Sequence, residues 1–409
     1  MAKNGFGGLC ATLLGLLSIT AAHAQINTLA SFDGSNGETP TASLTLSTDG
    51  TTLYGTTEYG GVSNDGTLFS VPLGGGTPTT LVNFDGSNGA YPYAGLTLSG
   101  NTLYGTTYDG GANGDGTVFS VPITGGAPTT LATFNSSNGA NPYAGLTLSG
   151  STLYGTTAVG GTSGNGTVFS APLTGGTTTT LATFNSSNGA NPQAGLTLNG
   201  NTLYGTTSAG GANGDGTVFS VPVTGGAPTT LATFTGSNGN FPEAGLTLSG
   251  NTLYGTTFIG GVDGTVFSLN LSTDVVSTLA YFYGSNGANP EAGLTLSGNT
   301  LYGTTTQGGA YDAGTVFSVP VTGGTPTTLA SFDGTNGTDP QSNLILIGNT
   351  LYGTTTGGGA YGDGTVFSLS IQAAPEPSIW ALLLGGLGLL AFWHQRTVAH
   401  ASESGFNSP

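Results

Sequence analysis

The chemistry open to most of this chain is that of carboxylates and tyrosines. No Lys, Arg, His or Cys residue occurs between residues 25 and 374 of the 409-residue sequence, whereas all of its 19 carboxylates except Glu376 and Glu403 do, which leaves 17. Without histidine or cysteine the region cannot form a Ser–His pair, a zinc site or a disulfide. Nucleic acid is excluded as a partner, because neutralising its phosphates needs cations that this region lacks. Carboxylate-pair catalysis, as in glycosidases, and the binding of sugar hydroxyls remain.

The pentapeptide Leu-Tyr-Gly-Thr-Thr sets the frame in which those residues are held. It begins at residues 53, 103, 153, 203, 253, 301 and 351, so the spacing is 50 residues except for one interval of 48. Nearly the whole 50-residue frame repeats around each copy. Such a period is the signature of a repeat architecture.

Each repeat reads as four short strands separated by turn signals. In the second unit these are Leu96–Leu98, Thr102–Thr107, Thr117–Val121 and Thr130–Phe134. Gly- and Asn-rich turns separate them, and the strands are rich in Thr, Val, Tyr and Phe. Four antiparallel strands per unit match the blade of a β-propeller. We therefore predict an all-β, seven-bladed propeller over residues 25–374.

The phase of the repeats favours a closed ring over an open β-solenoid. The chain begins with a fourth strand, Thr28–Phe32, and ends with a third strand, Thr365–Leu369. An open stack would expose both as edges. In a ring, residues 28–32 complete the last blade.

Two positions differ most among the repeats: the pair after Tyr-Gly-Thr-Thr, and the residue two before the glycine of the first strand. Both are predicted to lie on one face of the disc, where loops on a rigid scaffold usually bind ligands. Tyrosines beside carboxylates suit sugar hydroxyls, and the alternative is drift at exposed positions. The candidate binding residues are Glu58, Tyr59, Tyr93, Tyr108, Asp109, Tyr143, Glu243 and Glu291.

The Gly-rich loops that contain Asp65, Asp115, Asp215 and Asp363 are candidate calcium-binding sites. Each loop offers about one carboxylate, fewer oxygens than calcium wants. Asp-Gly is also a good turn. We expect structural turns and no cofactor.

Residues 1–24 read as a secretory signal peptide. Lys3 precedes an apolar run, and Ala22 and Ala24 offer the small residues that a signal peptidase inspects. We expect cleavage before Gln25. A buried helix is the alternative, but the run lacks amphipathic spacing.

The repeat resembles the bacterial tandem repeat called GloVer. The residues that carry the resemblance are YGTT, GG and GTVF in a fixed frame, seven times, from Thr28 to Leu369. The resemblance implies a secreted repeat protein with a surface anchor, with no enzymatic activity attached to the repeat.

The C-terminus resembles a PEP-CTERM sorting signal over residues 375–396. Pro375, Glu376 and Pro377 precede an apolar run, and Arg396 follows it. The resemblance implies processing by an exosortase-type enzyme and association with the membrane through this segment. The run of 15 residues, 379–393, is shorter than the ~20 of a comfortable span, and a polar tail, 397–409, extends beyond it. A plain membrane anchor with Arg396 on the cytoplasmic side is the alternative.

Together these features predict an exported, surface-tethered, non-enzymatic protein that binds extracellular polysaccharide or acts as a matrix component. A secreted carboxylate-dependent glycosidase or lyase is the alternative. No two acids stand out from the repeats as a unique pair in the sequence.

Overall fold

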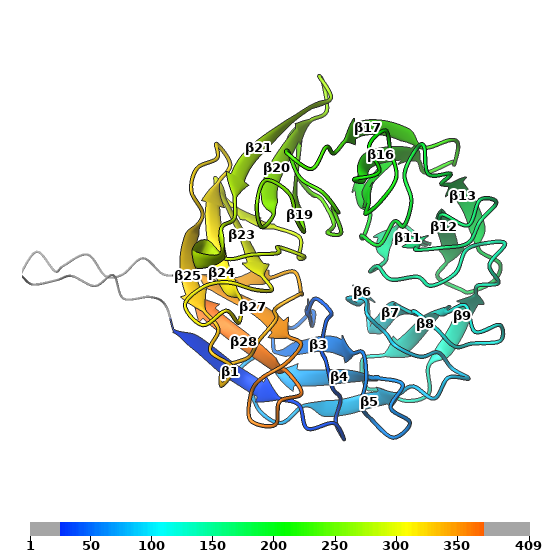
Figure 1. The fold of residues 1–409 in the computed structure, drawn as a ribbon. Coiled ribbons are helices and arrows are strands. Elements are labelled where there is room, and N and C mark those ends of the chain that lie inside the picture. Colours follow the sequence, from blue (N-terminus) through cyan, green and yellow to red (C-terminus); the bar gives the residue numbers. More distant parts are fainter. Residues whose placement is uncertain (1–24, 372–409) are drawn as a thin grey trace, which may run out of the picture. The chain divides into compact units, whose positions relative to one another are not determined.

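Seven four-stranded antiparallel sheets stand in a ring in the computed structural model, which describes residues 25–371 (Figure 1). The predicted seven-bladed β-propeller is therefore confirmed. The predicted signal peptide, sorting segment and polar tail lie outside the described residues. Among the residues described, no helix is long and apolar enough to cross a membrane.

In every blade the strands follow one another in chain order from the centre of the ring outward, except that the last blade takes its outer strand from the N-terminus. Blade 1 contains β2 (Thr45–Leu46), β3 (Thr52–Thr57), β4 (Thr67–Pro72) and β5 (Thr79–Asn83). Blade 2 contains β6 (Thr97–Ser99), β7 (Thr102–Thr107), β8 (Thr117–Pro122) and β9 (Thr129–Thr133). Blade 3 contains β10 (Thr147–Ser149), β11 (Thr152–Thr157), β12 (Thr167–Pro172) and β13 (Thr179–Thr183). Blade 4 contains β14 (Thr197–Asn199), β15 (Thr202–Thr207), β16 (Thr217–Pro222) and β17 (Thr229–Thr233).

The remaining three blades follow the same plan. Blade 5 contains β18 (Thr247–Ser249), β19 (Thr252–Thr257), β20 (Thr265–Asn270) and β21 (Val275–Tyr281), and a 3-10 turn, η1 (Gly284–Asn286), follows it. Blade 6 contains β22 (Thr295–Ser297), β23 (Thr300–Thr305), β24 (Thr315–Pro320) and β25 (Thr327–Ser331). Blade 7 contains β26 (Ile345–Ile347), β27 (Thr350–Thr355), β28 (Thr365–Ser370) and β1 (Ile26–Ser31).

The ring closes through the N-terminal strand, as predicted. β1 pairs antiparallel with β28, and Ile26 lies opposite Leu369. The strand begins two residues before the predicted Thr28, and Phe32 lies just beyond its end, fully buried. The pairing joins residues far apart in sequence, so the circle is held by a sheet ladder as well as by packing between blades.

Buried side chains of the repeated pentapeptide explain the packing between blades. In blade 1, Leu53 and Phe69 are fully buried. A Cβ on Gly55 would come within 2.6 Å of the Phe69 ring, so only glycine fits opposite that ring. Phe69 meets Phe32 of the neighbouring blade edge-on, with centroids 4.8 Å apart. Equivalent phenylalanine pairs recur between the other described neighbours.

The two threonines of the pentapeptide form hydrogen bonds between and within blades, in a region that has no basic side chain for a salt bridge. The Thr56 hydroxyl donates to the Ala94 carbonyl of the next blade, at 3.0 Å. The Thr57 hydroxyl lies 2.8 Å from that of Thr67 on the neighbouring strand of its own blade. The equivalent of Thr56 in blade 6 is an exception, because the buried Thr304 hydroxyl has no hydrogen-bond partner among the described residues.

Candidate binding site at the mouth of the central channel

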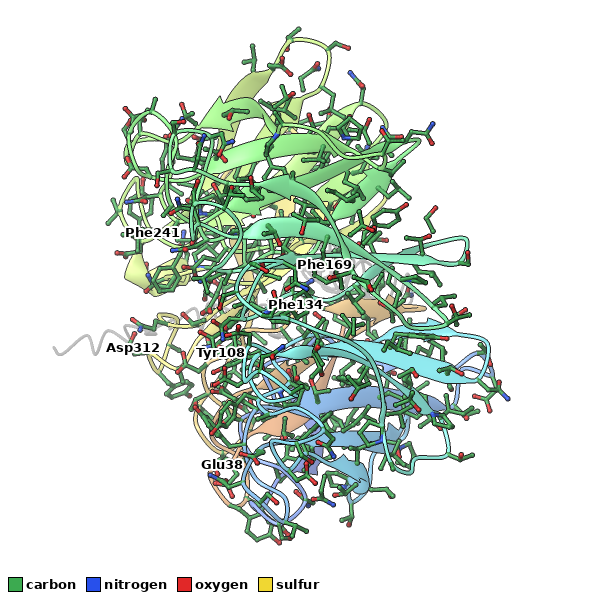
Figure 2. The ribbon with its side chains drawn as sticks, turned by 90° about the vertical axis from the view of Figure 1, so that its right-hand side faces the viewer. Glu38, Tyr108, Phe134, Phe169, Phe241 and Asp312 are labelled. Atoms are coloured by element: carbon green, nitrogen blue, oxygen red, sulfur yellow. The ribbon has the colours of Figure 1, made fainter. Side chains whose placement is uncertain are left out.

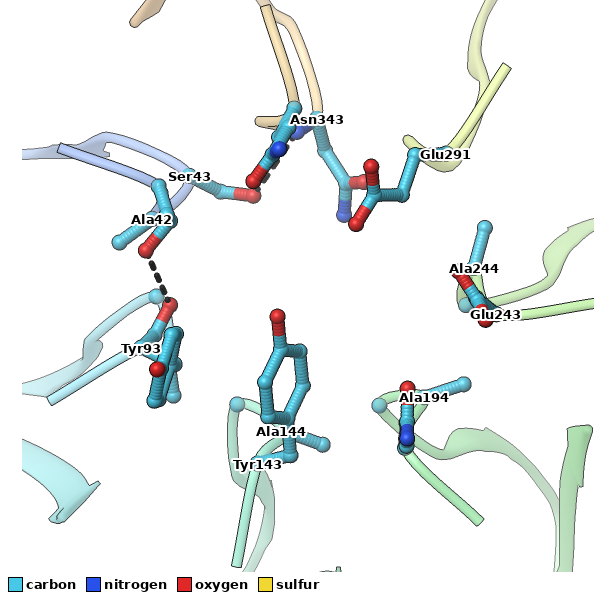
Figure 3. Close-up of a pocket in the computed structure, with 18 residues that line it drawn as sticks. Ala42, Ser43, Tyr93, Tyr143, Ala144, Ala194, Glu243, Ala244, Glu291 and Asn343 are labelled. Atoms are coloured by element: carbon cyan, nitrogen blue, oxygen red, sulfur yellow. Dashed lines mark hydrogen bonds between the residues drawn. The ribbon is translucent and has the colours of Figure 1, made fainter. Parts of the chain in front are cut away.

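Equivalent residues of all seven blades surround one cavity of about 110 Å³. They occupy the variable position two residues before the glycine of the inner strand. Because each blade contributes one, the cavity lies on the axis of the ring, and we call it the channel mouth (Figure 3). Its ring of variable residues consists of Thr41, Tyr93, Tyr143, Gln193, Glu243, Glu291 and Gln341.

A second cavity of about 300 Å³ adjoins the mouth between the inner strands. The two cavities share the residues at the glycine position of the blades, and the backbones are close there, since a Cβ on Gly145 would lie 3.2 Å from the Gly95 carbonyl oxygen. Asn343 and Ser43 replace glycine where the ring closes. The Asn343 amide nitrogen of the backbone donates to the Ser43 hydroxyl at 3.1 Å, a bond visible in Figure 3.

Tyrosines form one half of the mouth. Tyr93 and Tyr143 are stacked with centroids 4.6 Å apart, and the Tyr108 ring stands edge-on at 5.4 Å from Tyr93 and 6.2 Å from Tyr143. The Tyr93 hydroxyl donates a hydrogen bond to the Glu58 carboxylate. Burial, and then this hydrogen bond, raise the pKa of Tyr93 above its usual value. Burial, and then the charge of Glu291, raise the pKa of Tyr143, so both hydroxyls remain protonated donors.

Carboxylates form the other half. Figure 3 shows Glu243 and Glu291 across the mouth from Tyr93 and Tyr143. Burial raises the pKa of Glu243. Burial, followed by the charges of Glu243 and Asp339, raises the pKa of Glu291 to about 7. The sequence had singled out no unique acid pair, yet the ring brings these two together at neighbouring blades.

Four of the eight predicted residues do not line the mouth: Glu58 and Tyr108, which contact Tyr93, and Tyr59 and Asp109. The Tyr59 ring packs edge-on against Tyr91, with centroids 5.4 Å apart, and interaction with the Glu58 carboxylate raises the pKa of Tyr59. The Asp109 carboxylate accepts a hydrogen bond from the Asn141 side-chain amide at 3.1 Å. Of the eight candidates, four line the mouth, namely Tyr93, Tyr143, Glu243 and Glu291, and Glu58 and Tyr108 lie against Tyr93.

A further set of residues, which the sequence analysis did not identify, lies close to the mouth residues in the same crossover segments. It lies two residues before each mouth position and has a left-handed backbone, with φ between 54° and 57°. Such φ values are unusual for residues other than glycine, and asparagine adopts them most readily. Three of the seven are asparagine, which was the available signal. The set consists of Thr39, Tyr91, Asn141, Asn191, Phe241, Asn289 and Asp339.

Mouth and supporting loops share one face of the disc. Figure 2 shows Glu38, Tyr108, Phe241 and Asp312 along the same side of the ring, with Phe134 and Phe169 inside the sheets. The convergence of the crossover segments and of the loops between second and third strands on one face is what the four-stranded blade predicts.

The aspartates of the Gly-rich loops act as links between loops. The Asp115 carboxylate accepts a hydrogen bond from the Ser136 hydroxyl at 2.7 Å, and that of Asp263 accepts one from the Gly284 amide at 2.8 Å. Within residues 25–371, no three His, Cys, Asp or Glu side chains are grouped so as to hold a metal ion.

Similar solved structures show the same fold at low identity. YCF48 bound to the D1 peptide is 12% identical, with a TM-score of 0.55 over 86% of this chain and 97% of that one. An oligogalacturonate lyase in complex with manganese is 12% identical, with a TM-score of 0.50 over 88% and 96%. A puromycin-hydrolyzing peptidase of Mycobacterium tuberculosis is 13% identical, with a TM-score of 0.52 over 86% of this chain and 55% of that one. These three proteins have different functions and are only 12–13% identical to this chain, so the similarity indicates the fold alone.

No curated protein matches the chain. A family model does match, described as the Gloeobacter/Verrucomicrobia repeat, over residues 15–156, 50–263 and 260–376. These matches overlap and together cover residues 15–376, which include the whole propeller, in agreement with the repeated motifs in the sequence. The chain therefore belongs to the Gloeobacter/Verrucomicrobia repeat family.

Proposed function

We propose that this protein is an exported, surface-tethered, non-enzymatic propeller that binds extracellular polysaccharide through its channel mouth, as a component of the matrix around the cell. The observation that supports this function is that the cluster of Tyr93, Tyr143 and Tyr108 and the carboxylates of Glu243 and Glu291 lie at the same channel mouth. Aromatic faces suit the apolar faces of sugar rings, and carboxylates accept hydrogen bonds from hydroxyls.

The charge of the propeller narrows the ligand class. With no basic side chain between residues 25 and 374, the mouth has no cation with which to bind phosphate, sulfate or nucleic acid. A neutral or cationic saccharide meets no such penalty. Export and tethering rest on the sequence features of residues 1–24 and 375–396.

A binding assay with the full-length protein tests the proposal. Probes are the exopolysaccharide of the source cell and a glycan array that carries the cellulose, laminarin and chitin oligosaccharide series. Saturable binding is expected, and Tyr93→Ala and Tyr143→Ala should each lower the affinity. Tyr361→Ala is the matched control, because it removes an exposed tyrosine ring that does not line the mouth. A folded protein that binds no glycan would overturn the proposal.

One observation favours a second candidate, a carboxylate-dependent glycosidase or lyase. The pKa of Glu291 is raised to about 7, in part by the charge of Glu243 on the neighbouring blade, and two carboxyl groups, one with a raised pKa, are the usual catalytic pair of glycoside hydrolases. The test is the release of reducing ends or unsaturated products from the same oligosaccharides. Activity lost in both Glu243→Gln and Glu291→Gln would support the enzyme over the binding protein.

A further inference from the structure

Two tyrosine rings on the propeller are far more exposed than its packing requires. Tyr311 and Tyr361 are each 67% exposed. They occupy equivalent positions in the loops between the second and third strands of blades 6 and 7, where blades 1 to 4 have serine or asparagine. Neither ring contributes to the core, so stability does not explain why these two blades have an aromatic residue there.

Tyr311 lines a groove that is larger than the mouth. The groove is a cavity of about 530 Å³, and we define it by Gln307, Tyr311, Asp312, Thr338 and Asp339. Its volume falls in the range of about 300–1,000 Å³ that is usual for small-ligand sites. The mouth, at about 110 Å³, is below that range, so a longer chain that binds there must extend beyond it.

The groove and the mouth lie on the same face, and one crossover segment contributes to both. Thr338 and Asp339 line the groove, and Gln341, in the same crossover segment, lines the mouth. Figure 2 shows Asp312 of the groove and Tyr108 of the aromatic half of the mouth on one side of the disc. A chain molecule that enters the mouth therefore has a path over blades 6 and 7.

The groove also offers an acceptor that the protein leaves free. The Asp312 carboxylate accepts a hydrogen bond from the Gly308 amide, and that of Asp333 accepts bonds from Thr335 and Asn336. The Asp339 carboxylate, partly buried in the groove, accepts none from residues 25–371. Burial raises the pKa of Asp339.

We infer that this groove is a second saccharide subsite, with the Tyr311 ring as a stacking platform and Asp339 as the hydrogen-bond acceptor. The inference rests on the proposed function and extends it: the ligand is an extended polysaccharide chain bound along its length, and the mouth holds only one part of it. Affinity then rises with chain length until both subsites are filled.

Calorimetric titration of the full-length protein with the disaccharide and the octasaccharide of the series bound on the array tests this. Tyr311→Ala should lower the affinity for the octasaccharide on the order of tenfold, the effect of one stacked ring. The same variant should leave binding of the disaccharide unchanged, and Tyr311→Phe should bind like the wild type. Tyr361→Ala is the matched control, because that ring is equally exposed but lines a different cavity, beside β1.

The two ideas fail in different ways. If Tyr311→Ala binds the octasaccharide as tightly as Tyr361→Ala does, the second subsite is refuted, and Tyr93→Ala still decides the proposed function. If the disaccharide and the octasaccharide bind equally well to the wild type, the extended mode is refuted as well. If the wild type binds neither, the proposed function itself falls.

Discussion

Replacing Glu291 by glutamine should stabilise this propeller at high pH and leave it unchanged at low pH. Glu291 lines the mouth among carboxylates and tyrosines, and burial together with the charges of Glu243 and Asp339 raises its pKa from 4.5 to about 7. A raised carboxyl pKa means that ionisation penalises the folded state. The penalty is complete above pH 7, disappears as the pH falls toward 4.5, and is absent below it.

The size of the effect follows from the same interval. Each pKa unit corresponds to about 1.4 kcal/mol, so the ionised carboxylate costs the folded state roughly 3 kcal/mol above pH 7. Glutamine has no charge and nearly the same shape. Gln193 and Gln341 already occupy the equivalent position in other blades, so the substitution fits the mouth.

The assay is urea unfolding of the full-length protein, followed by circular dichroism across this pH range. The difference in free energy of unfolding between Glu291→Gln and the wild type should rise from near zero below pH 4.5 to roughly 3 kcal/mol above pH 7. Asp333→Asn is the sign control. Hydrogen bonds from Thr335 and Asn336 lower the pKa of Asp333, so its loss destabilises at neutral pH and matters less in acid. A flat difference for Glu291→Gln would refute the burial and charge argument.

Three further predictions concern the stability of the repeat, and each is tested by the free energy of unfolding of the variants. Thr206→Val removes a buried hydrogen bond of 3.0 Å to the Ala244 carbonyl of the next blade and should lower the free energy of unfolding by about 1 kcal/mol. Thr304→Val removes a hydroxyl that has no partner among the described residues, so it should leave the stability unchanged or raise it. Equal losses of stability in the two variants would refute the contribution of the hydrogen bond between blades. Gly105→Ala puts a Cβ 2.6 Å from a buried phenylalanine ring and should cost about 1–3 kcal/mol, while Gly74→Ala meets no atom within 4 Å and should be neutral. Thr39→Asn, at φ 56°, should gain roughly 0.5–1 kcal/mol, and a loss would show that the left-handed backbone is not strained there.

The strand frame could be predicted from the sequence because it is written seven times. The predicted strand over residues 102–107 is β7 itself, and the closing pair β1–β28 followed from the phase of the first and last repeats. The predicted first strand of the second unit, Leu96–Leu98, is displaced by one residue from β6, which begins at Thr97. Short strands of two or three residues depend on the neighbouring ladder more than on their own residue types.

The contacts within the site could be predicted only in part. Comparing repeats placed Tyr93 and Tyr143 on one face, but their stacking depends on the rotation between two blades, which one repeat does not encode. The same is true of the approach of Glu243 to Glu291. The left-handed backbone at Tyr91 was hidden because an aromatic residue gives no sign of it, unlike the asparagines at equivalent positions.

Ring closure also decides how this molecule responds to being pulled. β28 lies between two strands of its sheet, with hydrogen bonds to β27 on one side and to β1 on the other (Figure 1). Tension applied at Ser370 therefore acts on two ladders at once, and the strand must be drawn out from between its neighbours. β1 is an edge strand, so tension applied at Ile26 peels a single ladder from one side. The C-terminal strand of the propeller is therefore expected to resist extraction more strongly than the N-terminal strand.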